Sequence, residues 1–215
     1  SSENINISTT ALLETVSALS KQFGFPTLFD METLVTTTKL TKQVGISAES
    51  AGMLAAATVT TGKNFEDQYK DALGTSYELQ RQSGVQLDLR NILEESGKVT
   101  GTIRANLGSN VESIAAAVTQ AKLFGGSLDD VANASKSLLD FESSITAELE
   151  AELLLGKNIN LETARQASLN GDLATVAKEL TKEAGDYTEF SKMNVIQQEA
   201  LAKAMGMQSD QLADI

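Results

Sequence analysis

A recurrent pair of signals, a glycine followed closely by Ser, Asn or Asp, most constrains how this chain can fold. Glycine readily adopts the left-handed conformation that ends a helix. Ser, Asn and Asp side chains accept hydrogen bonds from the free N–H groups that begin the next helix. We therefore read each pair as the end of one helix and the start of the next. The pairs are Gly45 with Ser47, Gly62 with Asn64, Gly108 with Ser109, Gly126 with Ser127, Gly156 with Asn158 and Asn160, Gly171 with Asp172, Gly185 with Asp186, and Gly206 with Ser209.

Between these signals, apolar residues recur at the three- and four-residue spacing of a helix face. Three stripes stand out, and we expect each to face a core: Leu12, Val16, Leu19 and Phe23; Val111, Ile114, Ala115 and Val118; and Leu138, Phe141, Ile145, Leu149 and Leu153. The expected helices cover residues 8–23, 28–44, 48–61, 65–83, 86–107, 110–124, 128–155, 161–170, 173–184, 187–205 and 209–215. The segment 33–41 is rich in β-branched residues, but its helical neighbours favour a helix there too.

These patterns predict an all-α fold of consecutive short to medium helices. The glycine spacing is too irregular for a fixed-period solenoid, and the apolar columns are too interrupted for a coiled coil. Short connections favour antiparallel neighbours, so we expect a helical bundle or array. Pro26 indicates a bend that ends an N-terminal region, 1–26. A helical region, 27–126, and an acidic helical region with one long helix over 128–155, 127–215, complete the expected organisation.

Composition excludes several classes of protein. The chain has 17 Lys and Arg against 29 Asp and Glu, a net charge of −12, which argues against sequence-specific binding to nucleic acid. It has no Cys and no His, so it lacks thiolate metal sites, disulfides and the commonest general base. No apolar run is long enough to span a membrane, and no secretory signal is visible. Because the chain begins Ser1-Ser2 and its first Met is Met31, we expect it to be either processed or a piece of a longer protein, and we favour the second.

An acidic window is the first place to look for chemistry. Asp140, Glu142, Glu148, Glu150 and Glu152 fall in a stretch without a basic residue. Glu148 and Glu152 share one helix face, and paired carboxylates can bind a divalent cation or hydrolyse glycosides. A hydrolase would place one of them opposite a Glu or Asp of another helix across a cleft. The simpler interpretation, which we prefer, is a solvated face opposite the Leu149 and Leu153 stripe.

Other candidate sites have simpler structural interpretations. FGG at 124–126 with Ser127 could attract an anion at a helix start, but it lacks a P-loop lysine, and a helix cap fits better. NGD at 170–172 lacks the further acidic ligands of a calcium loop. We expect Arg165, Lys178 and Lys182 to pair with acids of their own helices, and Tyr69, Tyr77 and Tyr187 to fill the core. The C-terminal apolar residues could form either core or a seam for a partner helix: Met193, Val195, Ile196, Leu201, Met205 and Met207. We assign no catalytic, cofactor-binding or metal-binding residue.

One long string adds a resemblance. The stretch SLLDFESSITAELEAELLLGKNINLETARQASLNGD at 137–172, continued by EFSKMNVIQQEALAKAMGMQSDQLADI at 189–215, resembles part of bacteriophage tail tape measure proteins. VGISAES, GKNFEDQ and FGGSLDDVA are similar in style to the region upstream in that family, so the resemblance covers residues 44–215. It rests on the strings, because none of these motifs carries a catalytic signature.

The resemblance implies a structural virion protein without enzymatic activity or cofactor. Tape measure proteins are helical chains, usually in several copies, in the lumen of the tail tube. Their length sets tail length, because a helix advances about 1.5 Å per residue. They contact the tail-tip or baseplate hub, are assembled into the virion in the host cytoplasm, and leave before the DNA. The frequent glycines depart from a simple rod, so we expect a compact section that refolds or stretches on release. The alternative is an all-helical interaction or adaptor module that docks an apolar helix face on a partner.

Overall fold

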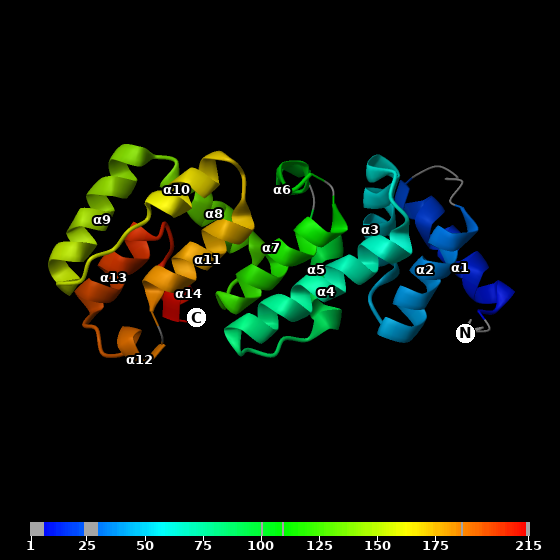
Figure 1. Ribbon diagram of the computed structural model, residues 1–215, viewed down its shortest axis with the longest axis horizontal. Coiled ribbons are helices and arrows are strands. Elements are labelled where there is room, and N and C mark those ends of the chain that lie inside the picture. Colours follow the sequence, from blue (N-terminus) through cyan, green and yellow to red (C-terminus); the bar gives the residue numbers. More distant parts are fainter. Residues whose placement is uncertain (1–6, 24–29, 100, 109, 186, 214–215) are drawn as a thin grey trace. The chain divides into compact units, whose positions relative to one another are not determined.

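The structure is a computed structural model that describes residues 7–23, 30–99, 101–108, 110–185 and 187–213 (Figure 1). All regular elements in these ranges are helices, which confirms the all-α class. The chain forms two compact units. Unit 1 comprises residues 1–82 and 86–115, and unit 2 comprises residues 83–85 and 116–215. The division therefore falls after Ala115 rather than after residue 126. The bend expected at Pro26 lies outside the described residues.

The helices are short and follow one another closely. Unit 1 contains α1 (Thr9–Phe23), α2 (Met31–Lys39), the π-helix η1 (Leu40–Val44), α3 (Ala48–Thr61), α4 (Phe65–Ser83), α5 (Leu89–Lys98), α6 (Gly101–Asn106) and the first residues of α7 (Val111–Leu123). The last residue of α4, Ser83, is assigned to unit 2. Unit 2 contains the rest of α7, α8 (Leu128–Leu138), α9 (Phe141–Leu155), α10 (Glu162–Leu169), α11 (Leu173–Ala184), α12 (Tyr187–Phe190), α13 (Val195–Ala204) and α14 (Ser209–Ala213).

Glycines end helices much as the sequence indicates. Gly45 follows η1 with φ +81°, and Gly156 follows α9 with φ +62°, where its N–H donates to the Glu152 carbonyl. Both backbones occupy the left-handed region, which side chains disfavour. Of the glycines in the predicted pairs, only Gly126 lacks a positive φ, because Gly125 takes that conformation at the end of α7.

The prediction of one long helix over 128–155 is wrong. It is divided into α8 and α9 by Leu139 and Asp140. The Asp140 carboxylate accepts hydrogen bonds from the backbone N–H and the hydroxyl of Ser143, at 3.4 and 2.8 Å. An Asp that caps the following turn in this way favours a helix start over helix continuation.

Two other expected helices are also divided, and one is irregular. The helix expected over 86–107 is interrupted by extended backbone at Val99, between α5 and α6. The helix expected over 187–205 breaks before Asn194, which forms a reciprocal capping box with Gln197 at the start of α13. The β-branched segment 33–41 is helical as expected, but it passes into the wider π-helix at Leu40.

In unit 1, α3 and α5 approach closely through small residues. A Cβ built on Gly97 would overlap the Cα and Cβ of Ser50, so this crossing admits no side chain at Gly97. The Ser50 hydroxyl donates to the Glu94 carbonyl at 3.0 Å. Arg104 of α6 donates to carbonyls at the end of α5, including that of Val99 at 2.7 Å. These contacts fix α5 and α6 to α3.

The predicted stripes in α1 and α7 face cores. Leu19 is buried, Leu12 and Val16 are half-buried, and the side chain of Phe23 lies outside the described part. All four stripe residues of α7 are buried: Val111, Ile114, Ala115 and Val118. The second stripe is therefore confirmed in full.

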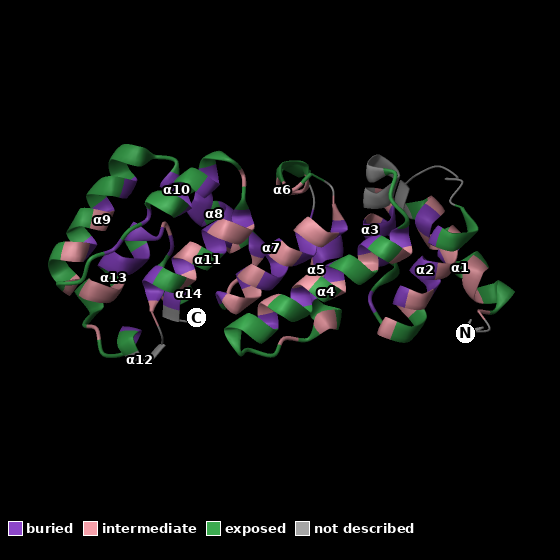
Figure 2. Ribbon diagram, viewed as in Figure 1, coloured by how far each residue is buried: buried purple, intermediate pink, exposed green. Residues whose placement is uncertain are grey.

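In unit 2, α9 packs along α13, and α10 packs along α11, with α8 against both α10 and α11 (Figure 1). The core of this unit includes the fully buried side chains Phe124, Leu138, Leu161, Leu180 and Leu201. Figure 2 shows buried positions concentrated on α8, α11 and α13, whereas α9 is largely exposed along its length. The exposed side of α9 is the most unusual feature of this unit.

Candidate functional site

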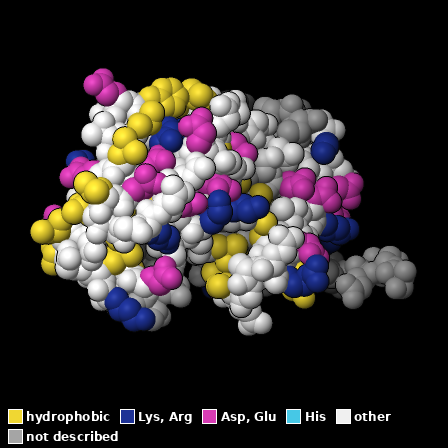
Figure 3. All heavy atoms as spheres, turned by 60° about the vertical axis from the view of Figure 1, so that its left-hand side comes forward, with side chains coloured by type: hydrophobic (Ala, Val, Ile, Leu, Met, Phe, Trp, Pro, Cys, Tyr) yellow, Lys and Arg dark blue, Asp and Glu magenta, His cyan; other side chains and the backbone are white. Residues whose placement is uncertain are grey.

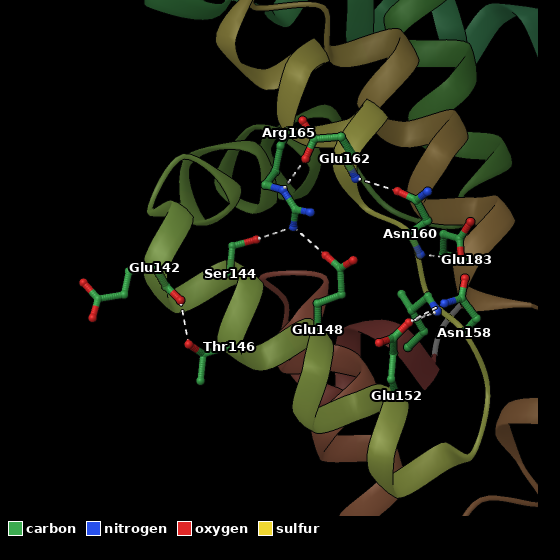
Figure 4. Close-up of polar contacts among 11 residues, drawn as sticks. Glu142, Ser144, Thr146, Glu148, Glu152, Asn158, Asn160, Glu162, Arg165 and Glu183 are labelled. Carbon is green, nitrogen blue, oxygen red and sulfur yellow. Dashed lines mark hydrogen bonds and ion pairs between the residues drawn. The ribbon is translucent and has the colours of Figure 1, made fainter.

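The acidic window lies on α9, and its central carboxylate is buried in an ion pair. Glu148 accepts a 2.5 Å hydrogen bond from Nη1 of Arg165, which lies on α10. Only 13% of the Glu148 side chain and 5% of the Arg165 side chain are exposed to solvent. The Arg165 guanidinium also donates to the Ser144 hydroxyl at 3.2 Å and to Glu162 at 3.4 Å (Figure 4). This set, Ser144, Glu148, Glu162 and Arg165, is called the Arg165 cluster below.

The second carboxylate of the predicted pair, Glu152, binds the loop after α9. Its Oε1 accepts hydrogen bonds from the side-chain amide of Asn158 at 2.8 Å and from the backbone N–H of Ile159 at 2.9 Å. The same loop is held on its other side, where the Asn160 N–H donates to Glu183 of α11 at 3.2 Å (Figure 4). Ile159 is buried beneath these contacts. Glu152 and Glu183 therefore fix the α9–α10 connection.

Glu148 and Glu152 differ from a fully solvated face, because they are half-buried and bind named groups of the fold. The rest of the acidic window is exposed as expected: Asp140, Glu142 and Glu150. A hydrolase arrangement would face Glu148 or Glu152 with a carboxylate across a cleft, whereas the structure places the Arg165 guanidinium against Glu148. Within the described ranges, no group of three acidic side chains is placed to hold a metal ion. The cluster holds α9 in a fixed orientation instead.

The apolar stripe expected to face the core is exposed. Leu138 is fully buried on α8, but the four stripe residues of α9 lie outside: Phe141 is 43%, Ile145 44%, Leu149 60% and Leu153 84% exposed. Because the helix breaks at Asp140, the apolar periodicity of α8 does not continue onto the same face of α9. The face of α9 that packs inward carries Ser144, Ala147 and Ala151, whose small side chains allow α13 to approach closely. We call Phe141, Ile145, Leu149 and Leu153 the α9 ridge.

The C-terminal apolar residues divide between the two roles left open by the sequence. Leu201, Met205 and Met207 are buried in the core of unit 2. Val195 and Ile196, at the start of α13, are 66% and 64% exposed. The Gln197 side-chain amide donates to the Leu154 carbonyl at 3.0 Å, so the start of α13 lies beside the end of α9. Val195 and Ile196 therefore lie near the Leu153 end of the α9 ridge.

An open depression of about 530 Å³ lies where α9 meets the end of α13. Its lining includes polar side chains, among them Ser143, Ser144, Glu199 and Lys203, together with alanines and Met207. Ser144 already binds Arg165, and Lys203 forms a 2.9 Å ion pair with Glu150. Since these groups are already bonded within the fold, the depression gives no basis for assigning chemistry.

The other candidate sites take structural roles or lie outside the described part. The hydroxyl of Ser127 caps α8 at 3.2 Å, and the Asp130 carboxylate accepts from both the N–H and the hydroxyl of Ser127. These bonds hold the pKa of Asp130 below its ordinary value. The helix start thus binds the protein's own carboxylate rather than an external anion.

Basic and aromatic candidates give mixed results. Lys182 pairs with Glu179 and Glu183 of its own helix, as expected. Arg165 pairs with Glu162 of its own helix but mainly with Glu148 of another, which the sequence did not predict. Tyr77 is 60% exposed, so it is not a core residue. Tyr69 is half-buried, and burial raises the pKa of its phenol, whereas the Tyr187 side chain lies outside the described part.

Two signals in the sequence could have revealed the orientation of α9. Asp140 with Ser143 is a helix-start pattern inside the expected long helix. Ser144, Ala147 and Ala151 form a small-residue face at helical spacing, which suits close helix packing. Together they indicate which side of α9 faces inward.

No helix among the described residues is long and apolar enough to cross a membrane. No protein-family model matches the chain, and searches of curated proteins and of solved structures found no match either.

Proposed function

We propose that this chain is a structural section of a bacteriophage tail tape measure protein, with no enzymatic role. It lies in the lumen of the tail tube of the virion, contacts tail-tip or baseplate hub proteins, occurs in several copies, and leaves before the DNA. The observation that supports this proposal most is the fold of the resembling stretch. Residues 137–172 and 189–215 fall in unit 2, where they form the end of α8, α9, α10, the end of α12, α13 and α14, whereas α11 lies between the two stretches.

The distribution of charge supports a role beside DNA without binding it. The chain has a net charge of −12. Many of its cations are already in ion pairs with acids, at distances up to 3.7 Å: Lys42, Lys70, Arg81, Lys98, Lys157, Arg165, Lys182 and Lys203. An acidic surface repels a phosphate backbone that passes through the same tube.

The short helices support a folded section rather than a continuous rod. A rod of 215 residues would span about 320 Å at about 1.5 Å per residue. Left-handed glycines interrupt the helices, as at Gly45 and Gly156, and the chain forms two compact units instead. In this proposal the section stretches when the tape measure leaves the tube. Force-extension measurements that find rigid, non-extending behaviour would contradict the stretching.

The proposal is tested by changing the length of the parent reading frame. We expect an in-frame deletion of this segment to shorten the tail, and an in-frame duplication to lengthen it, in electron micrographs of assembled virions. Because the section is folded, the change per deletion should be smaller than about 320 Å. Unchanged tail length in both strains, or a parent reading frame remote from tail tube genes, would refute the assignment.

A second candidate function has its own supporting observation. The exposed α9 ridge favours an all-helical interaction module that docks an apolar face on a partner. The two functions differ in the deletion experiment, since an adaptor would leave tail length unchanged.

A further inference from the structure

The α9 ridge is a continuous line of large apolar side chains on the surface. Its four residues follow one another at four-residue intervals, from Phe141 to Leu153, over about 18 Å of helix. All four are more than two-fifths exposed. Single exposed apolar residues are ordinary, but an aligned set indicates a contact surface.

The inward face of α9 prevents the ridge from turning into unit 2. Glu148 points from that face into the Arg165 cluster, where both charges are buried. Ala147 and Ala151, also on that face, are buried against the rest of unit 2. Rotating α9 to bury Leu149 would leave the Arg165 charge without its partner, which is costly inside a protein. The ridge therefore stays exposed unless something outside unit 2 covers it.

The charges beside the ridge are mainly negative. Glu142 is exposed and projects away from the Arg165 cluster (Figure 4). Glu150 is half-exposed and forms a 2.9 Å ion pair with Lys203, so Glu142 supplies the main negative charge beside the ridge. Figure 3, which turns the α9 side of the molecule forward, shows apolar surface with acidic side chains close to it.

The negative charge beside the ridge, called its acidic border below, distinguishes between the molecules that could cover the ridge. A second copy of the chain would bring two acidic borders together, and like charges at short range repel. An anionic lipid surface would be repelled for the same reason. A helix that carries Lys or Arg beside its own apolar stripe matches both the ridge and its border. A straight ridge with four-residue spacing also fits the groove between side chains of another helix.

We propose that the outer face of α9 binds an amphipathic helix of a partner protein. The partner's apolar residues contact Phe141, Ile145, Leu149 and Leu153, and its basic residues lie beside Glu142. This proposal develops the interaction module of the preceding subsection and is independent of the tail assignment. Binding and tail length are measured separately, so either can fail without the other.

The test uses the 215-residue chain and labelled synthetic helical peptides of about 14 residues. One peptide has Leu at the spacing of an amphipathic helix and Lys elsewhere. A second replaces Lys with Glu, and a third has the Leu and Lys residues scrambled. We expect fluorescence anisotropy to show binding of the Leu/Lys peptide at least tenfold tighter than that of either other peptide.

Variants of the chain separate the ridge from general charge attraction. The double variant L149N/L153N keeps every charge and changes only exposed positions, and it should bind the Leu/Lys peptide at least tenfold more weakly. The matched control Leu169→Asn, at a residue 55% exposed on α10, should bind like the wild type. A second variant, Glu142→Lys, should weaken binding of the Leu/Lys peptide without touching the ridge.

Several results would overturn the proposal. Equal binding of the scrambled peptide, or undiminished binding by L149N/L153N, would show attraction by charge alone. A wild-type dimer that L149N/L153N converts to a monomer in sedimentation would identify a second copy as the occupant. Ridge-dependent binding to vesicles that contain anionic lipid would identify a membrane surface instead. Circular dichroism melting of each variant would show that its helices are intact.

Discussion

The guanidinium of Arg165 on α10 lies 2.5 Å from the carboxylate of Glu148 on α9, and both side chains are almost completely buried. The pair joins two helices separated by the Asn158–Asn160 loop, and Ser144 supplies a further hydrogen bond to the same guanidinium. Its position explains why the side of α9 that carries Ser144 and Glu148 faces inward and the apolar ridge faces solvent.

Removing one member of this pair should be strongly destabilising. Arg165→Met leaves the Glu148 carboxylate buried without a counter-ion, so we expect the free energy of unfolding to fall by about 3–5 kcal/mol. Urea denaturation followed by circular dichroism would measure the loss.

The double variant R165M/E148Q serves as the control. It removes both charges, so it should recover most of the stability that Arg165→Met loses. Equal losses in the single and double variants would mean that Arg165 contributes packing rather than charge pairing.

The crossing of α3 and α5 predicts an unusual response to alanine. Ala normally stabilises a helix relative to Gly, but a Cβ at Gly97 overlaps Ser50. Gly97→Ala should therefore lower the free energy of unfolding by about 1–3 kcal/mol through overpacking.

Gly74 of α4 provides the matched comparison. A Cβ there would have no neighbour within 4 Å, so Gly74→Ala should raise the free energy of unfolding by about 0.5–1 kcal/mol. Thermal unfolding of the two variants should show melting temperatures that move in opposite directions. A shift in the same direction would disprove the close approach at Gly97.

The cap at the start of α8 should make stability depend on pH. Hydrogen bonds from the Ser127 side chain and backbone lower the pKa of Asp130 from its ordinary value of 3.8. A lowered pKa in the folded state adds stability that is complete above the ordinary value and is lost as pH falls through the folded value.

Asp130→Ala should accordingly cost about 1 kcal/mol at pH 7, and this difference from the wild type should shrink as the pH falls below 4. Urea titrations between pH 7 and pH 3 would measure it. A difference that does not change with pH would assign the loss to packing rather than to the ionised carboxylate.

The orientation of α9 can be tested by two substitutions on opposite faces. Leu149→Ala, at a residue 60% exposed, should change the free energy of unfolding by less than about 0.5 kcal/mol. Ala151→Leu, at a fully buried residue, should lower it by about 1–3 kcal/mol. Chemical denaturation would measure both changes in the free energy of unfolding. A larger loss for Leu149→Ala than for Ala151→Leu would place the ridge in the core.

Much of the fold could be predicted from local signals in the sequence. Glycines such as Gly156 and starting residues such as Asp172 act within one or two turns, so their effect is readable without a tertiary structure. The expected bounds of α3, α4 and α11 agree with the structure for this reason. The break at Asp140 was missed because periodic apolar residues on both sides suggested continuity.

The candidate site was harder to predict, because its decisive contact joins distant residues. The spacing of Phe141, Ile145, Leu149 and Leu153 is that of a buried stripe. The Glu148–Arg165 pair and the small inward-facing residues of α9 turn this stripe toward solvent. An ion pair between helices leaves no periodic signal in either helix. The sequence therefore located the apolar stripe of α9 correctly but placed it in the core rather than at the surface.

The exposed ridge also sets how this protein behaves in concentrated solution. Leucines aligned on a surface promote precipitation, and only mutual repulsion between acidic molecules opposes it. Added salt screens that repulsion, so storage buffers of high ionic strength favour aggregates over dispersed protein. We therefore expect light scattering to show more aggregate at high than at low ionic strength.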